Sequence, residues 1–323
     1  MQIFSIKTDS DLNAFSENTK LSDSGCVCAL GFFDGVHVAH RALISEAKKE
    51  AVRLSIPLVI FTFFSQSSLK SGQKRLFTDE EKFTELEGLG ADMVTVFNFD
   101  LIKNLSKDEF IEDILVQKLN THTAVSGFNF RFGKGASGNA EYLEKRLAAL
   151  NRRGIIIPEY KGGDGAVSST AIKALLSENK LMESAFLLGK PYFIDGAVKH
   201  GLGLGKNLGF PTVNMDIPNE KFSLPNGVYY TVLELSGKLF EGLTNVGTCP
   251  TFEEREIHTE TFILNFEGNV YDESIRLYFI EHLRGEIKFS SAEELIMQIN
   301  VDKKRALELK KEIQWQEIGL NLQ

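Results

Sequence analysis

Continuous apolar runs alternate with helix-like segments in the first half of the chain. Five runs resemble buried strands: CVCALGFF, PLVIFTFF, MVTVFNF, TAVSGF and GIIIPEY. Between them, His40–Leu54 carries apolar residues at helical spacing, and two segments begin with capping signals, Thr78 with Glu81 and Ser106 with Glu109. Apolar strands separated by helices indicate a parallel sheet that is covered on both faces, so this half predicts an α/β domain.

The pattern changes near Lys190. Beyond it, short runs that mix apolar and polar residues are separated by turn signals, and they read VYYTVLEL, KLFEGLTNV, ETFILNF and SIRLYFI. Short strands at close spacing predict an antiparallel barrel or sandwich, and the tail from Ser291 to about Trp315 predicts a helix. Two short helices are expected over Ser168–Leu188. We place the domain boundary between residues 184 and 185, which gives domains 1–184 and 185–323.

Composition narrows the class of protein. The 323 residues suit two domains, and 43% hydrophobic with 25% charged residues is ordinary for a cored protein. A net charge of −8 disfavours nucleic-acid binding as the main task. The longest apolar stretch, Ile56–Phe64, is far shorter than the roughly 20 residues that span a membrane, and the N-terminus lacks a signal pattern. Cys26, Cys28 and Cys249 form no CxxC pair, so we expect a reduced, cytoplasmic protein without a membrane partner.

The first candidate site is the segment GFFDGVHVAH, which follows an expected strand and precedes an expected helix. In parallel sheets, ligands bind beyond the carboxyl ends of the strands. His37 and His40 lie three residues apart at a helix start, where backbone N–H groups favour anions and imidazole donors can stabilise a transferring phosphoryl group. The alternative is a histidine pair that only caps the helix. The remaining candidates for nucleotide or phosphate contact are Gly31, Phe33, Asp34 and Gly35.

The second candidate site begins with a glycine-rich stretch, GLGLGKNLGFPTVN. Such a loop lets backbone N–H groups approach phosphates, and the candidates here are Gly201, Gly205 and Lys206. It is not a P-loop, because Asn207 follows the GK pair. The alternative is a glycine-rich bend in a β-barrel.

The residues after this loop predict a metal site and a general base. Thr212 and Asn214 share a face of an extended strand, so their oxygens can hold Mg²⁺ together with nucleotide phosphates and water. Glu260 could take a proton from an alcohol that attacks a γ-phosphate. The alternative for Glu260 is a solvent-facing strand residue.

The string FDGVHxxH resembles the FAD synthetase branch of the Rossmann-like nucleotidyltransferase superfamily, which implies that His37 and His40 are catalytic. Two further segments agree. GFNFRFGKGASGNAEYL resembles that branch's flavin loop, which implies flavin contacts from Asn129, Arg131 and Gly133. VSSTAIK resembles its second phosphate motif, SSTxIR, and the implied phosphate contacts are Ser168, Ser169, Thr170 and Lys173. Alone, these segments would be a surface turn and a helix cap.

The second half resembles riboflavin kinase, on the strings LLGKPYFIDGAV, GFPTVN, PNGVYY, NVGTCPTF and HLRGEIKFSSAEEL. By resemblance, Thr212 and Asn214 bind Mg²⁺ with the nucleotide, and Glu260 acts on the ribityl 5′-hydroxyl. The order of the motifs is similar to the bacterial bifunctional riboflavin kinase/FAD synthetase family. That resemblance implies phosphorylation of riboflavin to FMN and adenylylation of FMN to FAD, with ATP as co-substrate, ADP as a product of the kinase step and Mg²⁺ in both steps.

Several positions depart from the family's pattern. Ala39 stands where glycine is usual, Lys173 and Lys206 replace arginines, and a Pro-His-Pro element is missing from Phe61–Ser68. The strand reads ETFILNF where EVHILDF is more typical. Three alternatives therefore stay open: one retained activity with an impaired N-terminal half, a non-catalytic flavin-binding protein, and an adenylyltransferase for another acceptor. Self-association and transfer of FMN between domains do not follow from the sequence.

Overall fold

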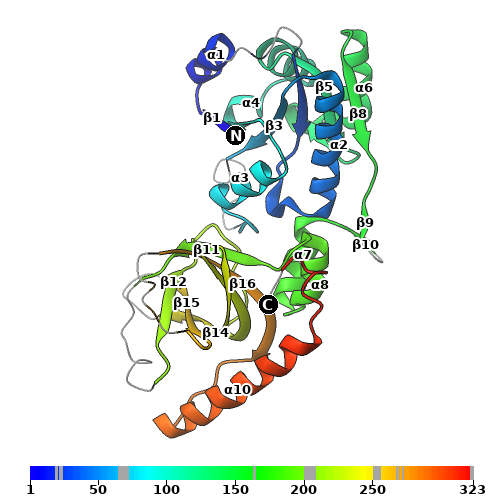
Figure 1. Cartoon of the computed structure of the whole chain (residues 1–323). Helices are drawn as coiled ribbons and strands as arrows, with labels where there is room; N and C mark the ends of the chain where they lie inside the picture. Colours follow the sequence, from blue (N-terminus) through cyan, green and yellow to red (C-terminus); the bar gives the residue numbers. More distant parts are fainter. Residues whose placement is uncertain are drawn as a thin grey trace. The chain divides into compact units, whose positions relative to one another are not determined.

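The computed structural model describes residues 1–18, 21, 25–64, 73–162, 165–199, 209–249, 256–266, 268, 270 and 273–320 (Figure 1). Contacts divide the chain into unit 1, Met1–Ser168, and unit 2, Ser169–Gln323. Two short helices, α7 (Ser169–Ser177) and α8 (Leu181–Leu188), belong to unit 2. The expected boundary at 184/185 falls within α8, and it stays a prediction about functional domains.

Unit 1 is built on a six-stranded sheet with the order β1-β4-β3-β2-β5-β8, and all of its paired strands are parallel. The strands are β1 (Gln2–Ile6), β2 (Cys26–Leu30), β3 (Leu58–Phe63), β4 (Met93–Phe97), β5 (Thr121–Gly127) and β8 (Arg153–Ile157). The main helices are α1 (Asp9–Asn18), α2 (Val38–Leu54), α3 (Asp79–Gly88), the π-helix η2 (Phe110–Lys118) and α6 (Ala140–Ala149). Short helices α4 (Phe99–Ile102) and α5 (Lys107–Glu109) precede η2.

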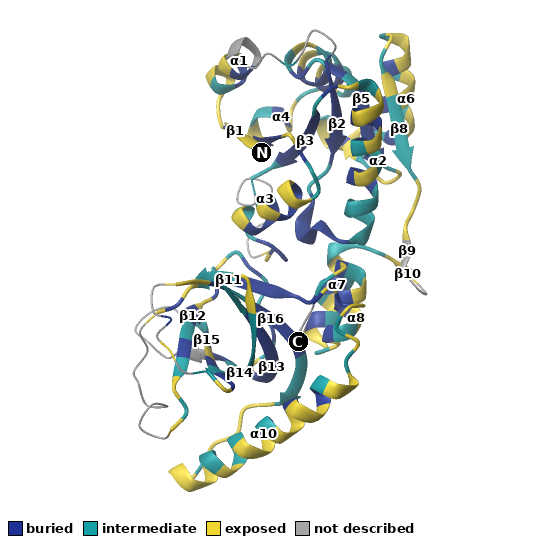
Figure 2. Ribbon diagram, viewed as in Figure 1, coloured by how far each residue is buried: buried dark blue, intermediate teal, exposed yellow. Residues whose placement is uncertain are grey.

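Both faces of this sheet are buried, as the continuous apolar runs predict. Every residue of β2 is buried, and Figure 2 shows the central strands in the colour of buried residues. Cys26 and Cys28 point toward one core cluster, which also holds residues of α1, η2 and α6. Helix α2 packs on β2 and β5. Burial raises the pKa of the Cys26 thiol to about 12, so it stays protonated as a small core residue.

Both capping signals read from the sequence are confirmed. At the start of α3, Thr78 Oγ1 accepts from the backbone N–H of Glu81, and the Glu81 carboxylate accepts from the N–H of Thr78. Ser106 and Glu109 make the same reciprocal pair at the start of α5. Each box satisfies two backbone donors that the helix leaves without partners, which fixes where the helix begins.

Unit 2 is an antiparallel barrel with the order β11-β16-β13-β14-β15-β12. Its strands are β11 (Phe193–Ala197), β12 (Thr212–Asp216), β13 (Gly227–Leu235), β14 (Lys238–Cys249), β15 (Glu256–Ile263) and β16 (Ser274–Arg284). Lys199, two residues beyond the end of β11, forms an isolated bridge to β12, in which Lys199 N donates to Asn214 O at 2.8 Å. This bridge nearly closes the sheet into a barrel, and it confirms the fold expected for the second half.

A tight turn fixes the register of two barrel strands, and a helix packs beside the barrel. Ser236 and Gly237 connect β13 to β14 with φ angles of 49° and 76°, the left-handed pair that a tight two-residue hairpin requires. Helix α10 (Ala292–Glu312) lies beside β14, where Lys310 Nζ pairs with Glu241 at 2.8 Å. None of the helices in the described part of the chain combines the length and the hydropathy needed to cross a lipid bilayer.

Candidate functional sites

In unit 1, a strained turn connects β2 to α2. Gly31 leaves no room for a side chain, because a Cβ there would lie 2.8 Å from the Phe33 ring. Phe33 and Val36 adopt left-handed φ angles of 56° and 40°, which non-glycine residues rarely do. Gly35, at φ 80°, turns the chain between them. Such strain persists where the surroundings enforce it, and here the turn presents the start of α2 at the carboxyl end of the sheet.

The two histidines of this turn lie against each other. Their rings stack with centroids 3.6 Å apart and planes 13° apart, and the edge of Phe33 contacts His40. His37 is also the N-cap of α2, because its Nδ1 accepts from the backbone N–H of His40 at 3.4 Å. That bond leaves the proton of a neutral His37 on Nε2.

Burial keeps both imidazoles neutral near pH 7. It lowers the pKa of His37 to about 4, against a smaller opposing effect of the Asp34 charge. Burial also lowers the pKa of His40 well below its ordinary value, and His37 adds to that effect. His40 Nδ1 is buried and has no hydrogen-bond partner among the described residues. The pair can therefore donate hydrogen bonds to an anion at the helix start, and the capping interpretation holds for His37 at the same time.

Two basic residues lie beside this turn and were not among the site residues predicted from the sequence. The Arg75 guanidinium lies 3.6 Å from the centre of the Phe32 ring, and Lys82 Nζ donates to Phe63 O at 2.9 Å. Both side chains are buried, and burial lowers the pKa of each despite nearby Asp34 and Asp79. Asp34 is itself buried, and its Oδ1 accepts from the backbone N–H of Leu76 at 2.8 Å. The string KRLFTDEEK contains these cations, but only the fold brings them to the ends of β2 and β3.

Two of the three predicted flavin residues line a cavity of about 400 Å³ in unit 1. Arg131 and Gly133 belong to its wall, while Asn129 does not. A side chain at Gly133 would approach the Lys107 backbone to 2.9 Å, and its φ of 74° also favours glycine. The rest of the wall is rich in aromatic rings: Phe63, Phe99, Phe110, Phe130 and Phe132. Phe130 and Phe132 stack, and Phe63 meets Phe99 edge to face. An aromatic wall of this kind suits a flat aromatic ligand.

The predicted phosphate motif of the first half opens unit 2. Ser168 is the last residue of unit 1, and Ser169, Thr170 and Lys173 lie in the first part of α7. Each unit is described by itself, so the placement of these residues beside the histidines stays a prediction.

In unit 2, the predicted metal and base residues come together on one face. Asn214 of β12 and Asn245 of β14 lie directly opposite Glu260 of β15, one on each side. Thr212 shares this face with Asn214, because Val213 and Met215, which alternate with them, point into the barrel core. Glu260 is 47% exposed, so its carboxylate is available to a ligand. Strand register therefore joins residues that are far apart in sequence.

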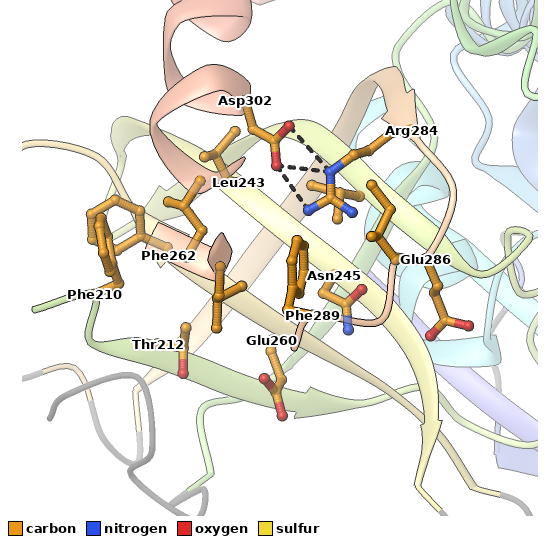
Figure 3. A pocket seen from close by; sticks show the side chains of 14 residues that line it. Phe210, Thr212, Leu243, Asn245, Glu260, Phe262, Arg284, Glu286, Phe289 and Asp302 are labelled. Atoms are coloured by element: carbon orange, nitrogen blue, oxygen red, sulfur yellow. Dashed lines mark hydrogen bonds and ion pairs between the residues drawn. The ribbon is translucent and has the colours of Figure 1, made fainter. Parts of the chain in front are cut away.

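This face borders a cavity of about 390 Å³ (Figure 3). Thr212, Asn245 and Glu260 line it, together with Phe210 and Phe262, whose rings meet edge to face. Asn214 is not part of the wall. The cavity is therefore mostly apolar with a few polar groups at one side, the usual composition of a small-molecule site.

A buried ion pair holds another part of the wall. Arg284 at the end of β16 pairs with Asp302 of α10, with Nη2 and Oδ2 2.9 Å apart, and Figure 3 shows both side chains facing each other. Gln298 Nε2 donates to the same carboxylate at 2.9 Å. No motif in the sequence predicted this pair, which holds α10 against the barrel.

The donor atoms on this face bear on the predicted Mg²⁺ site. Within the described ranges, no group of three or more His, Cys, Asp and Glu side chains could hold a metal ion. Thr212 and Asn214 instead offer neutral oxygens on one face, which suits a Mg²⁺ ion that takes its other ligands from phosphates and water. Gly201, Gly205 and Lys206 lie outside the described residues.

Two family models match the chain, one for each half. The model described as FAD synthetase matches residues 19–171, and the model described as riboflavin kinase matches residues 188–310. The chain is 33% identical over 291 residues to the bifunctional riboflavin kinase/FMN adenylyltransferase of Bacillus subtilis, covering 87% of this chain and 91% of that protein. It is 33% identical over 290 residues to the Escherichia coli K12 protein of the same name, covering 88% and 92%.

A solved structure extends the similarity to the fold. A crystal structure described as a macrolide-efflux protein from Streptococcus pneumoniae superposes with a TM-score of 0.81 at 26% identity. The match covers 93% of this chain and 98% of that chain, so it includes both units.

Proposed function

The chain belongs to the bifunctional riboflavin kinase/FMN adenylyltransferase family, and we propose which of its residues carry the two reactions. The barrel half phosphorylates riboflavin with ATP to give FMN and ADP. The α/β half adenylylates FMN with a second ATP to give FAD and pyrophosphate. We assign these activities to residues 185–323 and 1–184.

For the kinase step, Glu260 is the general base. It takes the proton of the ribityl 5′-hydroxyl while that oxygen bonds to the γ-phosphorus and the bond to the bridging oxygen of ADP breaks. The observation that carries this proposal is the row Asn214–Glu260–Asn245 beside Thr212, at the border of an apolar cavity. Thr212 and Asn214 would hold Mg²⁺, which supplies charge neutralisation for the phosphates when bound.

For the adenylylation step, His37 and His40 are hydrogen-bond donors rather than bases. The attacking FMN phosphate is already anionic, so its oxygen bonds to the α-phosphorus without losing a proton and pyrophosphate leaves. Neutral imidazoles at the start of α2 stabilise the charge that develops on the transferring phosphoryl group. The aromatic cavity lined by Arg131 and Gly133 supports a place for the isoalloxazine ring. Phosphate contacts from Ser168, Ser169, Thr170 and Lys173 are part of this proposal.

The test is to incubate the purified chain with ATP and Mg²⁺ and with either riboflavin or FMN, and to separate the flavins by chromatography. We expect FMN from riboflavin and FAD from FMN. FMN without FAD would mean that Ala39 and Lys173 disable the N-terminal half. Flavin binding without turnover would support the binding-protein alternative. A cytoplasmic location and the lack of a nucleic-acid partner stay predictions from composition.

A further inference from the structure

The strand that carries Glu260 also carries a histidine on the same face. His258 lies two residues before Glu260 on β15, so the two side chains project from the same side of the sheet. Its Nε2 is 3.6 Å from Glu260 Oε1, slightly longer than a hydrogen bond. Because Glu260 is 47% exposed and His258 is 22% exposed, a small rotation of the glutamate closes that distance.

Glu260 is the carboxylate left for this imidazole to contact. The register places Asp216 of β12 and Gly247 of β14 directly opposite His258. Asp216 forms an ion pair with Lys199. Gly247 has no side chain, but the Glu286 carboxylate lies beside it, 3.1 Å from the position of a Cβ there, and accepts from Asn226 Nδ2. Among the described residues, Glu260 is the carboxylate that comes within ion-pair range of His258.

The surroundings also decide which nitrogen of His258 carries the proton. Nδ1 is buried and lacks a hydrogen-bond partner in the part of the chain that the structure describes. A proton on Nδ1 would bury an unsatisfied N–H and would turn the lone pair of Nε2 toward the negative oxygen of Glu260. A proton on Nε2 avoids both costs and donates to the carboxylate.

We propose that His258 is a positioning residue for the kinase step, in which Nε2–H holds one oxygen of Glu260 so that the other faces the riboflavin hydroxyl. This inference rests on the proposed role of Glu260 as base. A hydrogen bond to one carboxylate oxygen fixes the orientation of the group and leaves the lone pairs of the other oxygen free for the hydroxyl proton. Its effect therefore belongs to the chemical step and not to substrate binding.

The experiment compares four variants in steady-state riboflavin phosphorylation at saturating ATP. H258L removes the donor at similar volume, H258Q keeps an N–H at the end of a side chain, E260Q removes the base, and H258L/E260Q combines the losses. We expect H258L to lower kcat about tenfold with KM for riboflavin nearly unchanged, and H258Q to recover most of that loss. Because His258 acts only through Glu260, the double variant should be no slower than E260Q.

Matched controls separate positioning from folding. D216N removes the carboxylate directly opposite His258 on β12 and should leave kcat unchanged. FMN adenylylation and thermal unfolding report whether each variant is folded. Wild-type kcat in H258L, equal loss in H258Q, or a further tenfold loss in the double variant would overturn the inference while Glu260 kept its role. Wild-type kcat in E260Q would instead overturn the proposed function and the inference with it.

Discussion

The two candidate sites both serve phosphate transfer, but one is a buried pair of histidines and the other is an accessible face of the barrel. In unit 1, His37 and His40 are packed against each other at a strained turn, and burial fixes their protonation. In unit 2, Glu260 and its cross-strand neighbours lie on an accessible barrel face, and strand register fixes their spacing. Adenylylation of an anionic phosphate needs donors and no base, whereas phosphorylation of an alcohol needs a base. The comparison shows that burial sets the charge state of the candidate groups in unit 1, whereas strand pairing sets the positions of the candidate groups in unit 2.

The largest expected effect tests the proposed role of Glu260 as the base of the kinase step. E260Q keeps the size of the side chain but cannot accept the hydroxyl proton. We expect riboflavin kcat to fall about 1,000-fold with FMN adenylylation unchanged, measured by flavin chromatography of both reactions. Equal loss of both activities would show that the two sites are not independent.

The next effect concerns the wall of the same cavity. D302A leaves the Arg284 guanidinium, whose side chain is only 16% exposed, without its carboxylate partner, which should lower the free energy of unfolding of unit 2 by about 3 kcal/mol. The single tryptophan of the chain, Trp315, packs against Tyr230, so its fluorescence during urea unfolding reports unit 2 alone. D302A/R284M removes the isolated charge and should recover part of the loss. An unchanged midpoint in D302A would show that solvent already screens the pair.

A third change separates the two interpretations of the histidines in unit 1. H37N keeps a side-chain oxygen that can cap α2, but it removes the Nε2 donor. We expect FMN adenylylation to fall about 100-fold while riboflavin phosphorylation is unchanged, the usual loss for one donor in a preorganised site. A wild-type rate would mean that His37 only caps the helix.

The smallest expected effect is the pH dependence of unit 1. Burial lowers the pKa of His37 from 6.5 to about 4, so the unfolded chain binds the proton first as the pH falls. The contribution of His37 to stability is therefore complete above about pH 7 and is lost as the pH falls from 6.5 to 4, amounting to about 2 kcal/mol between pH 7 and pH 5. Hydrogen exchange of the β2 and α2 amides measures it, with H37N as the control. Equal protection at both pH values would contradict the assigned cause.

Local sequence patterns predicted many of the helices and strands. Thr78 with Glu81 and Ser106 with Glu109 marked two helix starts, and the apolar runs located β2, β3, β4, β5 and the edge strand β8 of unit 1. Strand β1 was not predicted from its mixed pattern, and β11 was not assigned as a strand. Their identity depends on partners elsewhere in the chain, which local periodicity does not contain.

Site residues that lie close together in the sequence could be predicted from it. Site residues that strand pairing brings together from distant segments could not. Thr212 and Asn214 share a strand, so their common face followed from spacing alone. Asn245 opposite Glu260, and Arg284 beside Asp302, required the pairing of segments that lie far apart in sequence. The alternation of side chains along β15 predicts that His258 shares a face with Glu260. The burial of His258 Nδ1 depends on the fold and could not be predicted from the sequence.

The bridge between Lys199 and Asn214, which nearly closes the barrel of unit 2, affects which substitutions this unit can tolerate in evolution. Lys199 N donates to the carbonyl oxygen of Asn214, so the closure uses main-chain atoms at a position whose side chain is assigned to Mg²⁺. A descendant gene can exchange that side chain and keep the closing bond. Loss of phosphate chemistry at Asn214 is therefore compatible with an intact barrel, and a folded, inactive copy is an accessible product of drift.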